Sequence, residues 1–201
     1  MKKVIAMGLA KKIKYGVMAL PALPAYIAAF SGIKNTDIVA DMAVWKRRTP
    51  CPFKSSFWVF VFLMTEYPPF RNVIYYRLKQ YGRGTFYRLL LSPQHDIYLA
   101  CAGTIGGGFY ISHGYGTTIN VQSIGKNFHI YQGVTLGLKN GGVPTVGDNV
   151  TVYAGAKILG DVSIGDNAEI GANAVVISDV PADSVAVGVP ARVKLKTSCV
   201  N

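Results

Sequence analysis

Hydrophobic positions in the second half of the chain recur every six residues. Most six-residue blocks begin with an aliphatic residue, and the fifth position of most blocks is also apolar. The block starts are Leu99, Ile105, Ile111, Thr118, Ile124, Ile130, Leu136, Val146, Val152, Ile158, Ile164, Ile170 and Val176. The phase slips by one residue before Thr118 and by four residues after Leu136. Such a fixed period predicts a parallel β-helix in which three blocks close each coil.

This pattern also predicts which side chains form the core. The first and fifth residues of each block point inward and stack on their counterparts in neighbouring coils, about 4.8 Å away. The fifth positions are Phe109, Tyr115, Phe128, Val134, Val150, Ala156, Val162, Ala168, Ala174 and Val180. We therefore expect a mainly β protein with a second, non-repetitive region before it.

The first half of the chain shows helical spacing instead. Apolar residues three and four positions apart predict helices over 37–48 and 55–81, with a break at Pro68-Pro69 and a new helix near Phe70. The predicted organisation is an N-terminal helical region over 1–95, a β-helix over 96–181 and a C-terminal tail over 182–201.

Basic residues precede an apolar stretch, Val17 to Phe30, near the N-terminus. Pro21 and Pro24 interrupt this stretch, and it is shorter than the ~18 apolar residues of a spanning helix. The composition fits either an amphipathic arm packed on the protein or peripheral contact with an anionic membrane.

Composition indicates which kinds of binding partner to expect. The 201 residues are 50% hydrophobic but only 15% charged, which favours buried contacts between subunits. The net charge of +11 favours anionic partners or reflects a solvated positive surface. No nucleic-acid-binding motif accompanies the basic residues, so nucleic acid is not an expected partner.

Cysteine and histidine are sparse. Cys51, Cys101 and Cys199 form no zinc pattern, so we expect free thiols in a reducing cytoplasm and no metal site. Histidine is the side chain whose pKa suits a general base near neutral pH, and the sequence has His95, His113 and His129.

Four segments of the repeat carry a family resemblance. They are 112–116 (SHGYG), 131–137 (YQGVTLG), 158–165 (ILGDVSIG) and 187–192 (VGVPAR), and their order resembles that in the serine acetyltransferase branch of the hexapeptide acyltransferases. Segments 37–40 and 67–78 resemble the helices of this family more loosely. The resemblance implies a left-handed β-helix and an acetyl-CoA-dependent O-acetyltransferase.

The resemblance also implies roles for residues. His113 matches the catalytic histidine of the family, which removes the proton of the acceptor hydroxyl as that oxygen attacks the thioester. Gly137, Ala154 and Ala172 would line the groove for the pantetheine arm of acetyl-CoA. Lys157 and Arg192 would pair with the phosphates of the co-substrate.

The acceptor side departs from the serine acetyltransferase pattern. Ser112 stands where the family has an aspartate before the histidine, and Tyr98 stands where a carboxylate orients it. Asp37 or Asp41 could supply a helix aspartate. These differences predict a sugar hydroxyl as acceptor, in surface polysaccharide biosynthesis, with serine O-acetyltransferase as the alternative.

Two rival interpretations use the same architecture. A γ-type carbonic anhydrase needs three zinc-binding histidines, but the spacing here differs from that pattern. A non-catalytic scaffold would lack a groove and a base. The resemblance implies a homotrimer or a dimer of trimers, and we expect a cytoplasmic or membrane-peripheral location.

Overall fold

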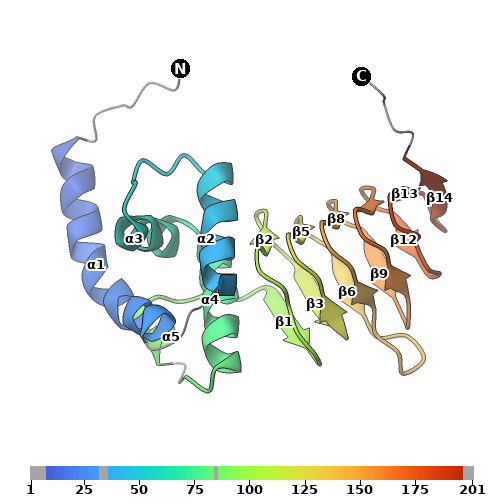
Figure 1. The fold of residues 1–201 in the computed structure, drawn as a ribbon, viewed down its shortest axis with the longest axis horizontal. Coiled ribbons are helices and arrows are strands. Elements are labelled where there is room, and N and C mark those ends of the chain that lie inside the picture. Colours follow the sequence, from blue (N-terminus) through green and yellow to red (C-terminus); the bar gives the residue numbers. More distant parts are fainter. Residues whose placement is uncertain (1–7, 32–35, 84–85, 197–201) are drawn as a thin grey trace. The chain divides into compact units, whose positions relative to one another are not determined.

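The chain forms two compact units, residues 1–94 and 95–201. A computed structural model describes residues 8–31, 36–83 and 86–196 (Figure 1). The first unit is helical and the second is a coil of short parallel strands, so the predicted fold class is confirmed.

Five helices make up the described part of the helical unit. They are α1 (Leu9–Phe30), α2 (Thr36–Arg48), α3 (Ser56–Glu66), α4 (Pro68–Gln80) and α5 (Tyr87–Leu90). The predicted helices over 37–48 and 55–81 are confirmed, including the break. The new helix begins at Pro68 rather than near Phe70, because proline is well tolerated in a first helical turn.

Helix α1 runs through both of its prolines. The predicted interruption at Pro21 and Pro24 is wrong, since both lie inside one 22-residue helix. Figure 1 shows that α1 bends along its length, as expected where proline removes a backbone donor.

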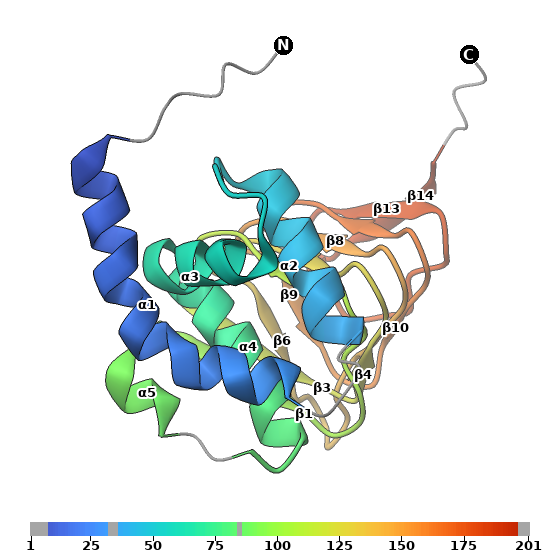
Figure 2. The same ribbon diagram turned by 60° about the vertical axis from the view of Figure 1, so that its left-hand side comes forward.

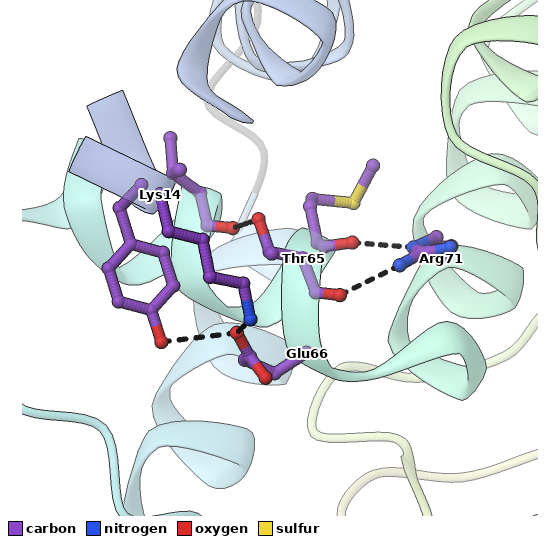
Figure 3. Close-up of polar contacts among 7 residues, drawn as sticks. Lys14, Thr65, Glu66 and Arg71 are labelled. Carbon is purple, nitrogen blue, oxygen red and sulfur yellow. Dashed lines mark hydrogen bonds and ion pairs between the residues drawn. The ribbon is translucent and has the colours of Figure 1, made fainter. Parts of the chain in front are cut away.

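Polar contacts fix the C-terminal end of α3. Arg71 donates hydrogen bonds from Nη2 to the Thr65 carbonyl at 2.8 Å and from Nε to the Met64 carbonyl at 2.5 Å (Figure 3). These carbonyls lie in the last turn of the helix, where no intrahelical donor is available. Glu66 at the same end accepts hydrogen bonds from Lys14 and Tyr15 of α1.

The second unit is built from three parallel sheets. The first contains β1 (Ile97–Cys101), β3 (Thr117–Val121), β6 (Thr135–Gly137), β9 (Lys157–Leu159) and β12 (Val175–Val176). The second contains β4 (Ser123–Ile124), β7 (Thr145–Val146) and β10 (Ser163–Ile164). The third contains β2 (Tyr110–Ile111), β5 (His129–Ile130), β8 (Thr151–Val152), β11 (Glu169–Ile170), β13 (Ser184–Val187) and β14 (Arg192–Leu195), the last antiparallel to β13. Strands that neighbour one another in a sheet come from successive coils, and Figure 2 shows the coils stacked behind one another.

The predicted core columns are largely confirmed. Eleven of the thirteen block starts are buried, from Ile105 through Val176, and so are nine of the ten fifth positions. Three residues differ. Ile119, not Thr118, points inward and pairs with Leu136, while Leu99 in the terminal coil is half-buried. Tyr115 is 66% exposed, and the buried residue at that level is Thr117.

These differences locate an irregularity in the repeat. Ile111 pairs with Ile130, and Ile119 pairs with Leu136. The chain therefore takes eight residues to go from Ile111 to Ile119, but only six to go from Ile130 to Leu136 in the next coil. The two additional residues lie in the segment 112–116. The stretch from Ile119 to Ile124 is one residue short, which leaves the net slip of one residue visible in the sequence.

A ladder of amide side chains supports one corner of the coils. Asn127, Asn149 and Asn167 all have positive φ, a conformation that asparagine adopts more readily than most residues. Asn127 donates to Asn149, Asn149 to Asn167 and Asn167 to Asp183, at 2.9 to 3.0 Å. The asparagines therefore adopt the left-handed conformation that these turns require, and their hydrogen bonds link four successive coils.

Candidate functional site

His113 occupies a strained turn between β2 and β3. Its φ is 64°, and the Gly114 N–H donates to the Ser112 carbonyl at 2.8 Å, which closes a three-residue γ-turn around the histidine. A Cβ at Gly114 would lie 2.5 Å from Cδ1 of Ile97, so glycine lets the turn sit on the core. The imidazole is exposed. Backbone strain of this kind is typical of functional sites.

Asp96 holds the far side of the same turn. Its carboxylate accepts a hydrogen bond from the Gly116 N–H at 3.0 Å, and its carbonyl accepts one from the Thr117 N–H at 3.2 Å. No motif in the sequence singled out Asp96. Tyr98, where the orienting carboxylate was predicted, lies in β1 two residues further along the chain.

The turn belongs to one corner of the β-helix, which we name the His113 corner. It consists of segments 112–116, 131–134, 153–156 and 171–174, each of which joins a strand of the third sheet to one of the first. Backbone hydrogen bonds connect these segments, from Gly133 to Tyr115, from Gly155 to Gln132 and from Asn173 to Ala154. Successive coils therefore place small residues in line with the histidine.

The predicted groove residues divide between two edges of the first sheet. Ala154 is half-buried and Ala172 is exposed, and both lie on the His113 corner. Gly137 ends β6 and pairs with Leu159, so it lies at the opposite end of the strands, before the hairpin in which Lys139 and Gly142 pair. The corner thus joins two of the three predicted groove residues to the histidine.

The predicted phosphate-binding residues differ in their surroundings. The Lys157 ammonium donates to the Gly133 carbonyl at 2.6 Å and to Thr135 Oγ1 at 3.1 Å. It therefore lies beside the His113 corner and is hydrogen-bonded to a backbone oxygen of that corner. Arg192 is exposed in β14.

An ion pair ties the residue that follows β14 to β11. The Lys196 ammonium lies 2.7 Å from Oε1 of Glu169, and Tyr153 donates to Oε2 at 3.2 Å. The hydrogen bond from Lys196 lowers the pKa of the Glu169 carboxyl.

The predicted acceptor residues lie in both units. In the β-helix, Tyr98 is 58% exposed on β1 and Ser112 is half-buried beside His113. In the helical unit, Asp37 is half-buried in the first turn of α2. Asp41 is fully buried, and its carboxylate accepts hydrogen bonds from Arg77 at 3.0 and 3.2 Å. An internal ion pair of this kind indicates a structural carboxylate.

His129 is buried, although the sequence favoured a solvent-facing position. Its ring lies 4.9 Å from that of Tyr110 and 4.5 Å from that of Tyr131, and Tyr131 stacks on Tyr153 at 5.4 Å. This aromatic row covers the third sheet next to the His113 corner. Within the described residues, no group of three His, Cys, Asp or Glu side chains could hold a metal ion.

Comparison with known proteins shows which proteins the chain resembles. A family model described as bacterial transferase hexapeptide (six repeats) matches residues 144–178. Over 94 residues the chain is 56% identical to a serine acetyltransferase of Synechocystis sp. and 48% identical to one of Staphylococcus aureus. Each match covers 44% of this chain, and they cover 38% and 44% of the two relatives, so the similarity spans less than half of their length.

Solved structures match over more of the chain. The serine acetyltransferase of Neisseria gonorrhoeae in complex with serine is 26% identical, with a TM-score of 0.66 over 94% of this chain and 84% of that one. The Entamoeba histolytica serine acetyltransferase 1 in complex with L-cysteine is 29% identical, with a TM-score of 0.59 over 90% and 74%.

These matches correct the predicted acceptor. The relatives and the solved structures are serine acetyltransferases, so the prediction of a sugar acceptor in polysaccharide biosynthesis is wrong. The prediction drew on groups missing from the acceptor side.

Proposed function

We propose that this chain, which fits the serine acetyltransferase-like branch of the hexapeptide acyltransferases, transfers the acetyl group of acetyl-CoA to the hydroxyl of serine. One observation carries the proposal. An exposed histidine is held in a strained γ-turn, on the corner where small residues of the next coils line up with it. The same corner would supply the general base and the surface on which acetyl-CoA binds, and would hold the two in a fixed relative position.

The imidazole of His113 acts as general base. It removes the proton of the serine hydroxyl while that oxygen attacks the carbonyl carbon of the thioester. The tetrahedral intermediate then collapses, the carbon–sulfur bond breaks, and the proton passes from the imidazolium to the departing CoA sulfur. The products are O-acetylserine and CoA, and no acyl-enzyme forms. Ser112 takes no covalent part, since the turn directs adjacent side chains differently.

Acetyl-CoA would lie along the His113 corner. Ala154 and Ala172 leave room for the pantetheine arm because neither side chain extends beyond Cβ. Lys157 places a positive charge at the same corner, where it would attract the anionic co-substrate. The acceptor would bind beside His113, at a site completed by a neighbouring subunit in a homotrimer or a dimer of trimers.

A thiol-release assay with the full chain tests this proposal. Acetyl-CoA is supplied with L-serine, with a panel of sugars, or alone, and products are identified by mass spectrometry. We expect CoA release that depends on serine and a product that carries one acetyl group on oxygen. Release with a sugar but not with serine would contradict the acceptor, and absence of acetyl-CoA binding by calorimetry would favour a non-catalytic scaffold.

A further inference from the structure

The positive charge of the protein is confined to its helical unit. Residues 1–94 contain 15 Lys and Arg but only 3 Asp and Glu, a formal charge of +12. Residues 95–201 contain 6 and 7, a formal charge of −1. The unit that carries His113 therefore has no excess of positive charge, and the excess points to an anionic partner of the helices.

Helix α1 has the reverse of the usual amphipathic arrangement. In its second half, the buried positions of the helix are alanines, Ala22, Ala25 and Ala29, all at most 1% exposed. The outward side carries large aliphatic side chains that are 40 to 74% exposed and spaced three or four residues apart. They are Leu9, Ile13, Val17, Leu20, Leu23 and Ile27. A surface helix in water presents its large apolar residues to the core instead.

Helix α5 extends this apolar surface. Phe86, Leu89 and Leu90 are 55%, 88% and 47% exposed. A shallow groove is lined by Leu20 and Ile27 of α1 together with Phe86, and Figures 1 and 2 show α5 beside the second half of α1. We call the six aliphatic residues of α1 and these three residues the outward face.

Lysines stand at one end of the outward face. Lys11 and Lys12 are exposed in the first turns of α1, whereas Lys14 pairs with Glu66 at 2.5 Å and fastens α1 to α3 (Figure 3). No charged residue follows between Tyr15 and Phe30. An apolar face with adjacent cationic side chains complements a bilayer that contains anionic lipid.

We propose that the helical unit docks on an anionic lipid bilayer through the outward face, with α1 lying in the interface. Among the described helices, α1 is the one long and apolar enough to cross a membrane. Its uncharged part, Tyr15 to Phe30, spans only about 24 Å at ~1.5 Å per residue, less than the ~30 Å hydrocarbon core. Tyr15 also contacts Phe62 and Glu66 of α3, so one side of α1 is occupied by protein.

Vesicle flotation with the full chain tests the docking independently of acetyl transfer. We expect the protein to float with phosphatidylcholine vesicles that contain phosphatidylglycerol, and to float less with phosphatidylcholine alone. High salt should weaken the first interaction, and carbonate should release the protein. Absence from both vesicle fractions would overturn the proposal, as would retention through carbonate washing, which indicates a spanning helix.

Two exposed apolar positions test the face itself. The double variant Leu20→Gln/Ile27→Gln should lower the vesicle partition coefficient roughly 30-fold or more, because each aliphatic side chain loses burial in the bilayer. Val39→Gln is the control, since Val39 is 54% exposed on α2. If the double variant instead halves the mass measured by light scattering and leaves flotation unchanged, the face joins two copies of the chain and the proposal fails.

Two lysines test the charge. Lys11→Gln/Lys12→Gln should weaken binding to the anionic vesicles roughly 10- to 30-fold and leave binding to neutral vesicles unchanged. Lys126→Gln/Lys139→Gln removes the same charge from exposed positions of the β-helix and should have no effect. Equal losses from both double variants would show that the location of the lysines is irrelevant, contrary to the proposal.

Discussion

The Gly116 N–H donates a hydrogen bond to the Asp96 carboxylate at 3.0 Å, and this bond fastens the turn of His113 to the first coil. Asp96 thus acts as a positioning residue, because this hydrogen bond holds the backbone of the turn. The role of the histidine depends on where its imidazole points, and displacement by about 1 Å can cost ~100-fold in rate.

Replacement of Asp96 should therefore lower kcat. We expect Asp96→Ala to reduce kcat about 10- to 100-fold with little change in the KM for serine, as the turn loses its anchor. Asp96→Asn keeps an oxygen acceptor for Gly116 and should retain most activity. Asp161→Ala, at an exposed carboxylate of the same unit, serves as control. If Asp96→Asn is as impaired as Asp96→Ala and its pH–rate profile shifts, the charge acts on His113 directly.

The hexapeptide period predicted most of the β-helix because every coil repeats the same burial. A column such as Ile130, Val152 and Ile170 requires only that an aliphatic residue recur at the same position of each coil. The pattern failed where the coil is irregular. It assigned Thr118 and Tyr115 to the core because it registered one net slip, whereas the chain inserts two residues and then omits one.

The candidate site lies at that irregularity. The two additional residues at 112–116 form the strained turn that holds His113, and a six-residue period does not predict such a turn. The helical unit had no such repeat to guide prediction. Spacing located α2 to α4, but it did not reveal that α1 continues through Pro21 and Pro24, because the packing of α1 against α3 is a tertiary contact that spacing within one segment does not record.

Removal of the imidazole should separate activity from stability. We expect His113→Asn to lower kcat/KM for serine about 100-fold or more, the size typical of a general base. Its unfolding midpoint should match the parent, because asparagine accepts positive φ. His113→Gly should be equally inactive and up to ~1 kcal/mol more stable, as strain is relieved. Turnover equal to the parent in either variant would remove His113 from the mechanism.

The asparagine ladder should contribute to stability in two separable ways. Asn149→Gly keeps the left-handed turn but loses the hydrogen bonds to Asn127 and Asn167, which should cost about 1–2 kcal/mol. Asn149→Ala also forces a Cβ-bearing residue without a compensating side chain into positive φ, which adds about 1 kcal/mol. Urea unfolding monitored by circular dichroism gives both values. Equal losses in the two variants would show that backbone strain is unimportant there.

The Asp41–Arg77 pair should stabilise the helical unit rather than bind the acceptor. Both side chains are at most 1% exposed, so Asp41→Asn leaves a buried guanidinium without its counter-charge and should cost about 3–5 kcal/mol. The double variant Asp41→Leu/Arg77→Met replaces the pair by apolar side chains and should recover most of that loss. Urea unfolding measures the stability, and serine kinetics at low temperature measure KM. A raised KM for serine in the well-folded double variant would instead assign Asp41 to the acceptor site, because restored stability leaves no other cause for weaker binding.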